Sequence, residues 1–172
     1  TAMAARPGGN PPQLQTIGLA TSADGHKFDT PRRILSQSEK YPPNRGFVGY
    51  STPAAFVLNG RVHLFHDVAA FVAGANPEWM QVALQHAVSE DGETNFVEDD
   101  KPLLVREDFH FTSGEILGPA ALVDGDRVRI WFSGHVTYGE LLPFVIRGYK
   151  GNEFGIGHAY VNLETFLADQ DE

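Results

Sequence analysis

The chain contains seven histidines and no cysteine, so imidazoles and carboxylates are its first candidates for chemistry. His66 and Asp67 are neighbours at the end of an apolar run. There the carboxylate can orient the imidazole for proton transfer, or the two side chains can contact a metal ion. The alternative is a histidine that caps the turn after a strand. Asp67 is therefore a candidate catalytic residue.

Two further histidines occupy matching positions of aligned segments. His86 precedes Ala87, and His158 precedes Ala159. Equivalent positions of a repeat converge toward an axis or are equally buried between units, so these imidazoles either hold a divalent cation or pack as polar core residues. Neither has a carboxylate near it in sequence, which favours packing over a metal site.

The elements that must position these residues come from a repeat. The Asp-Gly turn at Asp24 recurs at Asp91, and Pro53-Ala-Ala-Phe-Val-Leu recurs as Pro119-Ala-Ala-Leu-Val-Asp, with offsets of 67 and 66 residues. Short apolar runs joined by tight turns at this period are typical of stacked four-stranded antiparallel units. The sequence therefore predicts an all-β chain built of propeller blades.

About ten strand-like runs make up this repeat, and four per blade give about 2.5 blades. We expect a flexible arm over residues 1–16, which are rich in Pro and Gly, one partial propeller over 17–167 and an acidic tail over 168–172. The expected strands are 17–22, near 28, 54–58, 62–67, 82–89, near 96, 120–123, 128–133, 154–161 and near 166.

The charge composition of the chain bears on which molecules it can bind. The net charge is −9, with 13 Lys and Arg against 22 Asp and Glu, which disfavours nucleic acid and anionic membranes as partners. The sequence has no apolar run of bilayer length and no signal-peptide pattern at its start. Because the absence of cysteine fits several compartments, the localisation stays open.

Three segments resemble the blade motifs of five-bladed β-propeller glycoside hydrolases, meaning family 43 and the related families 32, 62, 68 and 117 of the furanosidase superfamily. The segments are Ile17-Gly-Leu-Ala-Thr-Ser-Ala-Asp-Gly, Pro53-Ala-Ala-Phe-Val-Leu-Asn-Gly and Phe154-Gly-Ile-Gly-His-Ala-Tyr. The resemblance covers residues 17–166 and implies a ring of which this chain forms about half. Because an open half-ring exposes sheet edges, we expect a homodimer that completes it; the alternative is a fragment whose other half is absent.

The resemblance also implies hydrolysis of a glycosidic bond by two carboxylates. In the family, an Asp stands beside a Pro in two blades and a Glu closely precedes a Gly-Pro in a third. Glu115-Ile-Leu-Gly-Pro119 resembles the acid motif with two additional residues, so Glu115 is the candidate acid, against a ligand-binding carboxylate or a solvated loop residue. Ser51-Thr52-Pro53 has no carboxylate at the equivalent position, and we expect the blade of the base to precede Ile17, outside the chain.

The remaining candidates are substrate-binding residues, because aromatic rings stack on sugar faces and a guanidinium can bind hydroxyl groups. They are Arg45, Phe47, Tyr50, Trp79, Phe111 and His135, with loop packing and surface ion pairs as the alternatives. The family often carries calcium beside a histidine, which implies His86 and His158 as metal ligands. Two functions stay open: a carbohydrate-active hydrolase, and a non-catalytic sugar-binding or scaffold half-propeller.

Overall fold

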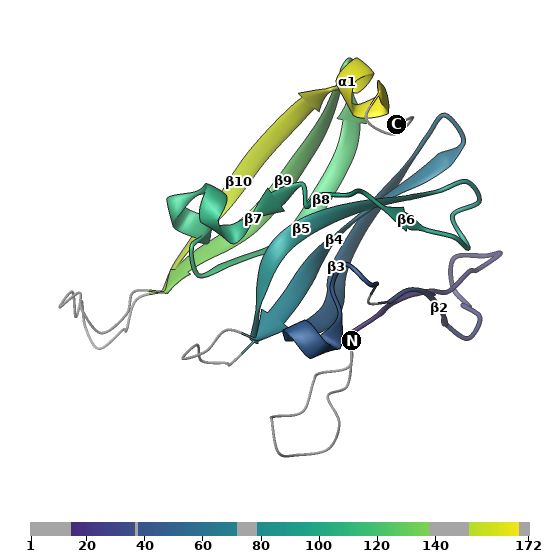
Figure 1. Cartoon of the computed structure of the whole chain (residues 1–172). Coiled ribbons are helices and arrows are strands. Elements are labelled where there is room, and N and C mark those ends of the chain that lie inside the picture. The colour runs from purple at the N-terminus through teal and green to yellow at the C-terminus, as the bar shows by residue number, and fades with distance from the viewer. Residues whose placement is uncertain (1–14, 37, 72–78, 138–151, 169–172) are drawn as a thin grey trace.

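The structure is a computed structural model that describes residues 15–36, 38–71, 79–137 and 152–168. Its described residues form three antiparallel sheets and one short α-helix, which confirms the predicted all-β class (Figure 1). The expected arm, 1–16, and acidic tail, 168–172, lie almost wholly outside the described residues. Gln15, at the end of that arm, is buried and forms an isolated bridge with Gly49.

The central sheet is an antiparallel meander of β3 (Phe47–Leu58), β4 (Arg61–Phe71), β5 (Trp79–Ser89) and β6 (Val97–Glu98). A fifth strand, β7 (Leu104–Val105), also pairs with β5. This is the four-stranded unit that the repeat predicted.

The turn between β3 and β4 fits the sequence signal for a hairpin. Asn59 and Gly60 both have positive φ, at 52° and 82°. A two-residue turn of this kind matches the twist of antiparallel strands, and Asn-Gly adopts it readily.

Two smaller sheets flank the central one. The C-terminal sheet consists of β8 (Glu115–Asp124), β9 (Arg127–Thr137) and β10 (Asn152–Asn162), and it is followed by α1 (Leu163–Ala168). The N-terminal sheet pairs β1 (Ile17–Leu19) with β2 (Arg32–Leu35). Three 3-10 turns complete the described elements: η1 (Pro43–Arg45), η2 (Arg106–Asp108) and η3 (His110–Thr112).

The core lies between the sheets. On one face of the central sheet, Tyr50, Leu64 and Val68 pack with Ile17 and Leu35 of the N-terminal sheet. On the other face, the C-terminal sheet buries two clusters, which are Phe65, Val128, Ile130 and Phe166, and Leu84, Ile116 and Phe132. Each large apolar side chain buried in this way stabilises the fold by about 1.5–3 kcal/mol.

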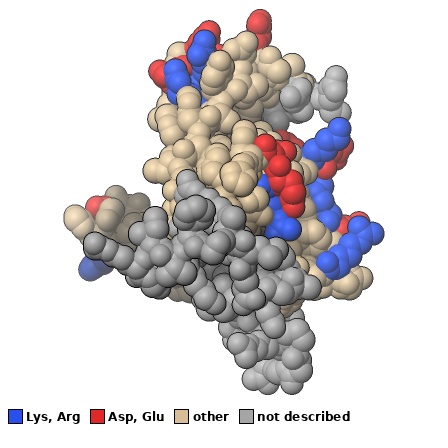
Figure 2. Space-filling model, turned by 90° about the vertical axis from the view of Figure 1, so that its left-hand side faces the viewer, with Lys and Arg blue, Asp and Glu red and all other residues tan. Residues whose placement is uncertain are grey.

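Charged side chains are unevenly spread over the side of the molecule on which β10 lies in Figure 1. Figure 2 shows this side, with Lys, Arg, Asp and Glu at the top and along the right of the view and a smaller number at its left edge. The tan surface between them carries no visible charge.

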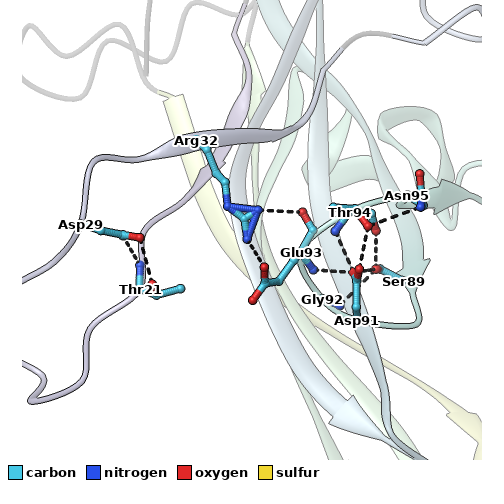
Figure 3. A network of polar contacts seen from close by, with 9 residues as sticks. All are labelled: Thr21, Asp29, Arg32, Ser89, Asp91, Gly92, Glu93, Thr94 and Asn95. Carbon is cyan, nitrogen blue, oxygen red and sulfur yellow. Dashed lines mark hydrogen bonds and ion pairs between the residues drawn. The ribbon is translucent and has the colours of Figure 1, made fainter.

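The repeated Asp-Gly turns have the same internal bonding. Asp91 accepts hydrogen bonds from the backbone N–H groups of Glu93 and Thr94 (Figure 3). Asp24 accepts hydrogen bonds in the same way from the backbone N–H groups of the two residues that follow Gly25. Arg32 of β2 then reaches Glu93 at 2.6 Å and ties the N-terminal sheet to the second turn.

Two of the expected strands are absent from the structure. Phe28 lies in a loop and is 63% exposed, and Phe166 lies in α1. The segment Leu-Glu-Thr-Phe-Leu-Ala is rich in good helix formers, and its helix lets Phe166 cover the core cluster around Phe65. Residues near 166 were therefore wrongly expected to form a strand.

Candidate functional site

The strands β3 and β8 are in contact, and each is interrupted by a bulge at the same position of the repeat. Thr52 in β3 has a φ of 41°, and Gly118 in β8 has a φ of 64°. Each precedes a proline, Pro53 or Pro119, which has no N–H to donate to the ladder. The strand pairing therefore breaks there, and the bulges re-aim the neighbouring side chains.

Asp67 of β4 connects the two bulges. One carboxylate oxygen accepts a hydrogen bond from the Ser51 hydroxyl at 2.5 Å. The other accepts from the Thr52 hydroxyl and, at 3.4 Å, from the backbone N–H of Gly118. Asp67 is completely buried. Burial raises its pKa, and the hydrogen bonds from Ser51, Thr52 and Gly118 oppose that rise.

The expected pairing of the Asp67 carboxylate with His66 is not formed. The strand continues to Phe71, and successive side chains of a strand point to opposite faces. His66 therefore packs on the ring of Tyr50, with centroids 4.4 Å apart, and its Nε2 lies 3.6 Å from Glu98. The two side chains therefore do not form one proton-transfer pair, and the assignment of Asp67 as a catalytic residue stays a prediction.

Glu115 lies beside His135 where β8 begins. The two residues are direct cross-strand partners, and Oε2 of Glu115 is 3.0 Å from Nδ1 of His135. Oε1 accepts a hydrogen bond from the backbone N–H of Gln81 in β5 at 3.1 Å. The side chains of Glu115 and His135 are 17% and 9% exposed. The carboxyl group is thus held by two other strands and still reaches solvent.

The turn η3 fixes the start of β8 through close packing on glycines. A Cβ atom on Gly134 would lie 2.4 Å from the Thr112 methyl group, and one on Gly155 would lie 2.9 Å from the Phe111 ring. Thr112 is completely buried, and its hydroxyl donates to the carbonyl of Arg106 at 2.7 Å. Glycine at these positions lets η3 rest directly on β9 and β10.

Of the predicted substrate-binding residues, the structure places only His135 against Glu115. Arg45 is exposed in η1, and Phe47 is half-buried against Tyr41. Tyr50 is completely buried, and Phe111 is half-buried on Phe132. The side chain of Trp79 lies outside the described residues. These assignments stay predictions.

The two candidate metal ligands occupy equivalent strand positions in different sheets. His86 is buried, with Nε2 3.1 Å from Nδ1 of His63 and Nδ1 2.9 Å from Asp99. His158 is exposed on β10 and stacks on Trp131. No group of three or more His, Cys, Asp or Glu suited to a metal ion occurs in the described part of the chain. The assignment of His86 and His158 as metal ligands stays a prediction.

The sequence did not predict the chain of polar contacts from His63 through His86 to Asp99. Nothing in the spacing marks it, because His63 and His86 meet across two strands and Asp99 follows β6. Burial lowers the pKa of His63 to about 4, and the neighbouring His86 and Arg61 lower it further. His63 is therefore neutral at pH 7, packed under Phe166 of α1.

No protein-family model and no curated protein matches the sequence. Solved structures do match it. The chain is similar in fold to glycoside hydrolases of family 43. No helix among the described residues is long and apolar enough to cross a membrane.

Three of the similar structures are a GH43_1 enzyme from Xanthomonas citri complexed with xylotriose, CoXyl43 and RS223-β-xylosidase. The first has 12% identity and a TM-score of 0.45, and the match covers 64% of this chain and 28% of that one. CoXyl43 is a β-xylosidase/α-arabinofuranosidase from a compost microbial metagenome, with 9% identity, a TM-score of 0.47 and coverages of 73% and 36%. RS223-β-xylosidase has 12% identity, a TM-score of 0.49 and coverages of 74% and 35%. The matched region thus spans about a third of these chains.

Proposed function

We propose that this chain takes part in hydrolysis of a glycosidic bond, with Glu115 as the general acid. The observation that carries the proposal is the Glu115–His135 pair, in which a carboxyl oxygen lies 3.0 Å from an imidazole nitrogen at a partly open position. An imidazole and a carboxyl group at this distance can pass a proton between them. Glu115 would give its proton to the leaving oxygen as the bond from that oxygen to the sugar breaks.

Hydrolysis needs a second carboxylate to activate water or attack the sugar. Both carboxylate oxygens of Asp67 already accept hydrogen bonds, from Ser51, Thr52 and Gly118. We therefore assign Asp67 a positioning role, in which it fixes the bulges of β3 and β8. The second carboxylate would then come from outside the described residues, and we propose that association with a second copy of the chain supplies it. The ligand would be a carbohydrate.

A second candidate function is sugar binding without hydrolysis. It is favoured by Ser51-Thr52-Pro53, which puts hydroxyl groups where the resembling family has an aspartate. Both hydroxyls are engaged by Asp67, so β3 itself contributes no carboxylate at its bulge.

The deciding experiment is hydrolysis of aryl xylosides and arabinofuranosides by the wild-type chain and by Glu115→Gln. We expect the variant to lose about a hundredfold or more in rate on substrates with a poor leaving group, because a general acid contributes roughly that much. The loss should be much smaller with dinitrophenyl glycosides, because such a leaving group departs without a proton. Glu39→Gln, at an exposed position, is the matched control and should keep the wild-type rate.

Two other results of this experiment would contradict the proposal. Equal losses on both kinds of leaving group would show that Glu115 is not the acid. A wild-type chain that binds xylo-oligosaccharides without turnover would favour the binding function.

A further inference from the structure

The C-terminal sheet buries one face against the central sheet and leaves the other face open. Alternate residues of β10 are exposed: Phe154, Ile156 and Tyr160 are 71%, 80% and 57% accessible to solvent. Leu122 of β8, 44% exposed, belongs to the same face. We call this surface the open face and define it by Leu122, Trp131, Phe154, Ile156, His158 and Tyr160.

The repeat identifies what kind of surface this is. Trp131 corresponds to Phe65 at the offset of 66 residues, and His158 corresponds to His86. Phe65 and His86 are cross-strand partners with ring centroids 4.8 Å apart, and Trp131 and His158 are cross-strand partners with centroids 4.9 Å apart. The same arrangement of rings is thus built on the central sheet and on the C-terminal sheet.

Only the first copy of this arrangement is covered. Phe65 and His86 are completely buried, and Phe65 packs with Ile130 of β9 and Phe166 of α1. Trp131 is half-buried and His158 is exposed. The open face therefore has the composition of a surface that packs against another sheet, and burying its apolar area would stabilise an assembly.

The charged groups on this face lie toward the turn between β8 and β9, and His158 is a polar residue within the face. Arg129 is paired with Asp124 at 2.6 Å, and Arg127 lies over the ring of Tyr160 at 4.6 Å from its centroid. A largely apolar and aromatic centre with paired charges at the rim is the usual anatomy of a protein interface.

We propose that the open face is the surface through which two copies of this chain associate, each packing its open face on that of the other about a twofold axis. The proposal rests on the self-association put forward under the proposed function. A twofold contact needs one apolar face used twice. Among the described residues, the other exposed large hydrophobics are scattered over separate elements: Phe28, Val57, Val97 and Phe109.

This arrangement would bring the second copy next to the candidate acid. At one end of the open face, Phe154 packs on His135 with ring centroids 5.3 Å apart, and His135 contacts Glu115. The partner therefore borders the Glu115–His135 pair, which is where a second carboxylate is needed.

The test is sedimentation velocity of the wild-type chain, Ile156→Lys and Val57→Lys over about a hundredfold range of concentration, since mass action makes dimers concentration-dependent. Val57 is 69% exposed on β3 and is the matched control. We expect a dimer for the wild type and Val57→Lys and a monomer for Ile156→Lys, all with the same circular dichroism spectrum.

A second measurement does not depend on a lysine being tolerated. Because the chain has no cysteine, Ile156→Cys introduces a single thiol, and packed sheets lie about 10 Å apart. A bismaleimide linker of that reach should join two copies of Ile156→Cys and should leave Val57→Cys unlinked.

The outcomes separate the two proposals. A monomeric wild type overturns self-association itself, and if Ile156→Lys then also loses binding of the sugars used in the activity assay, the open face belongs to carbohydrate. A dimer in all three proteins, with no linkage of Ile156→Cys, keeps self-association and overturns the assignment of this face.

Discussion

Asp67 shows how a buried carboxylate can serve a site without touching a ligand. Its two oxygens accept three hydrogen bonds that come from two strands of different sheets. Thr52 has a φ of 41°, a value that a threonine seldom adopts, so its backbone needs support from neighbouring groups. The hydrogen bond from its hydroxyl to Asp67 supplies that support. Asp67 therefore holds Thr52 and Gly118, the residues that precede the two prolines, through hydrogen bonds.

We expect Asp67→Asn to lower the free energy of unfolding by about 1–3 kcal/mol, because an amide N–H₂ would face donors that now have an acceptor. Urea unfolding at neutral pH measures the change. Asp100→Asn, at an exposed position, should leave the midpoint unaltered. If Asp67→Asn unfolds at the wild-type midpoint, the positioning role assigned to Asp67 is wrong.

At the scale of elements, the packing of η3 on β9 controls where β8 begins. Gly134 precedes His135, and the N–H of Gly114 donates to the carbonyl of His135 at 3.0 Å. A side chain at Gly134 would meet the Thr112 methyl group and the carbonyl of Phe111. The strand that carries Glu115 would then have to move with the turn.

We expect Gly134→Ala to cost about 1–3 kcal/mol in stability, as overpacking usually does, and to lower activity along with it. Thermal unfolding and the glycoside assay measure the two effects. Gly18→Ala is the comparison: its nearest neighbour would be the Arg32 carbonyl at 3.3 Å, so its effect should be smaller. Equal midpoints for wild type and Gly134→Ala would contradict the close packing described here.

The elements were largely predictable because their signals are local. Asp24 and Asp91 mark equivalent turns, and Asn59-Gly60 marks a hairpin, and each forms as expected. The apolar run before Asp67 was recognised, but the strand continues through Val68 to Phe71, so His66 and Asp67 lie on opposite faces of β4 and not together in a turn at its end. Strand limits decide which face a side chain takes, and they depend on tertiary pairing.

The candidate site was less predictable for the same reason. Glu115 could be named as a candidate because Gly118 and Pro119 follow it closely in the sequence. Its contact with Gln81 could not be predicted, because that contact depends on how two sheets pack on each other. His135 had no local signal beyond its place in a strand. The bond between His86 and Asp99 spans thirteen residues and a turn, so no short motif contains it.

At the scale of the whole molecule, buried histidines link the sheets and make stability depend on pH. His63 lies where the central sheet meets α1 and the C-terminal sheet, and His66 lies on the opposite face of β4 beside Tyr50. Each imidazole is neutral in the folded chain, because burial lowers the pKa of each to about 4. Protonation of either one thus opposes packing on its side of the central sheet.

We expect the free energy of unfolding to fall as the pH drops from about 6.5 to about 4. An unfolded histidine has a pKa near 6.5, so over this range the unfolded chain binds protons that His63 and His66 do not, and the full stability is present only above it. For His66 alone the loss amounts to about 3 kcal/mol. Urea unfolding at a series of pH values measures it: His66→Gln should flatten the slope, and His26→Gln, at an exposed position, should not. A wild-type free energy that stays constant from pH 7 to pH 4 would show that these imidazoles are not buried as described.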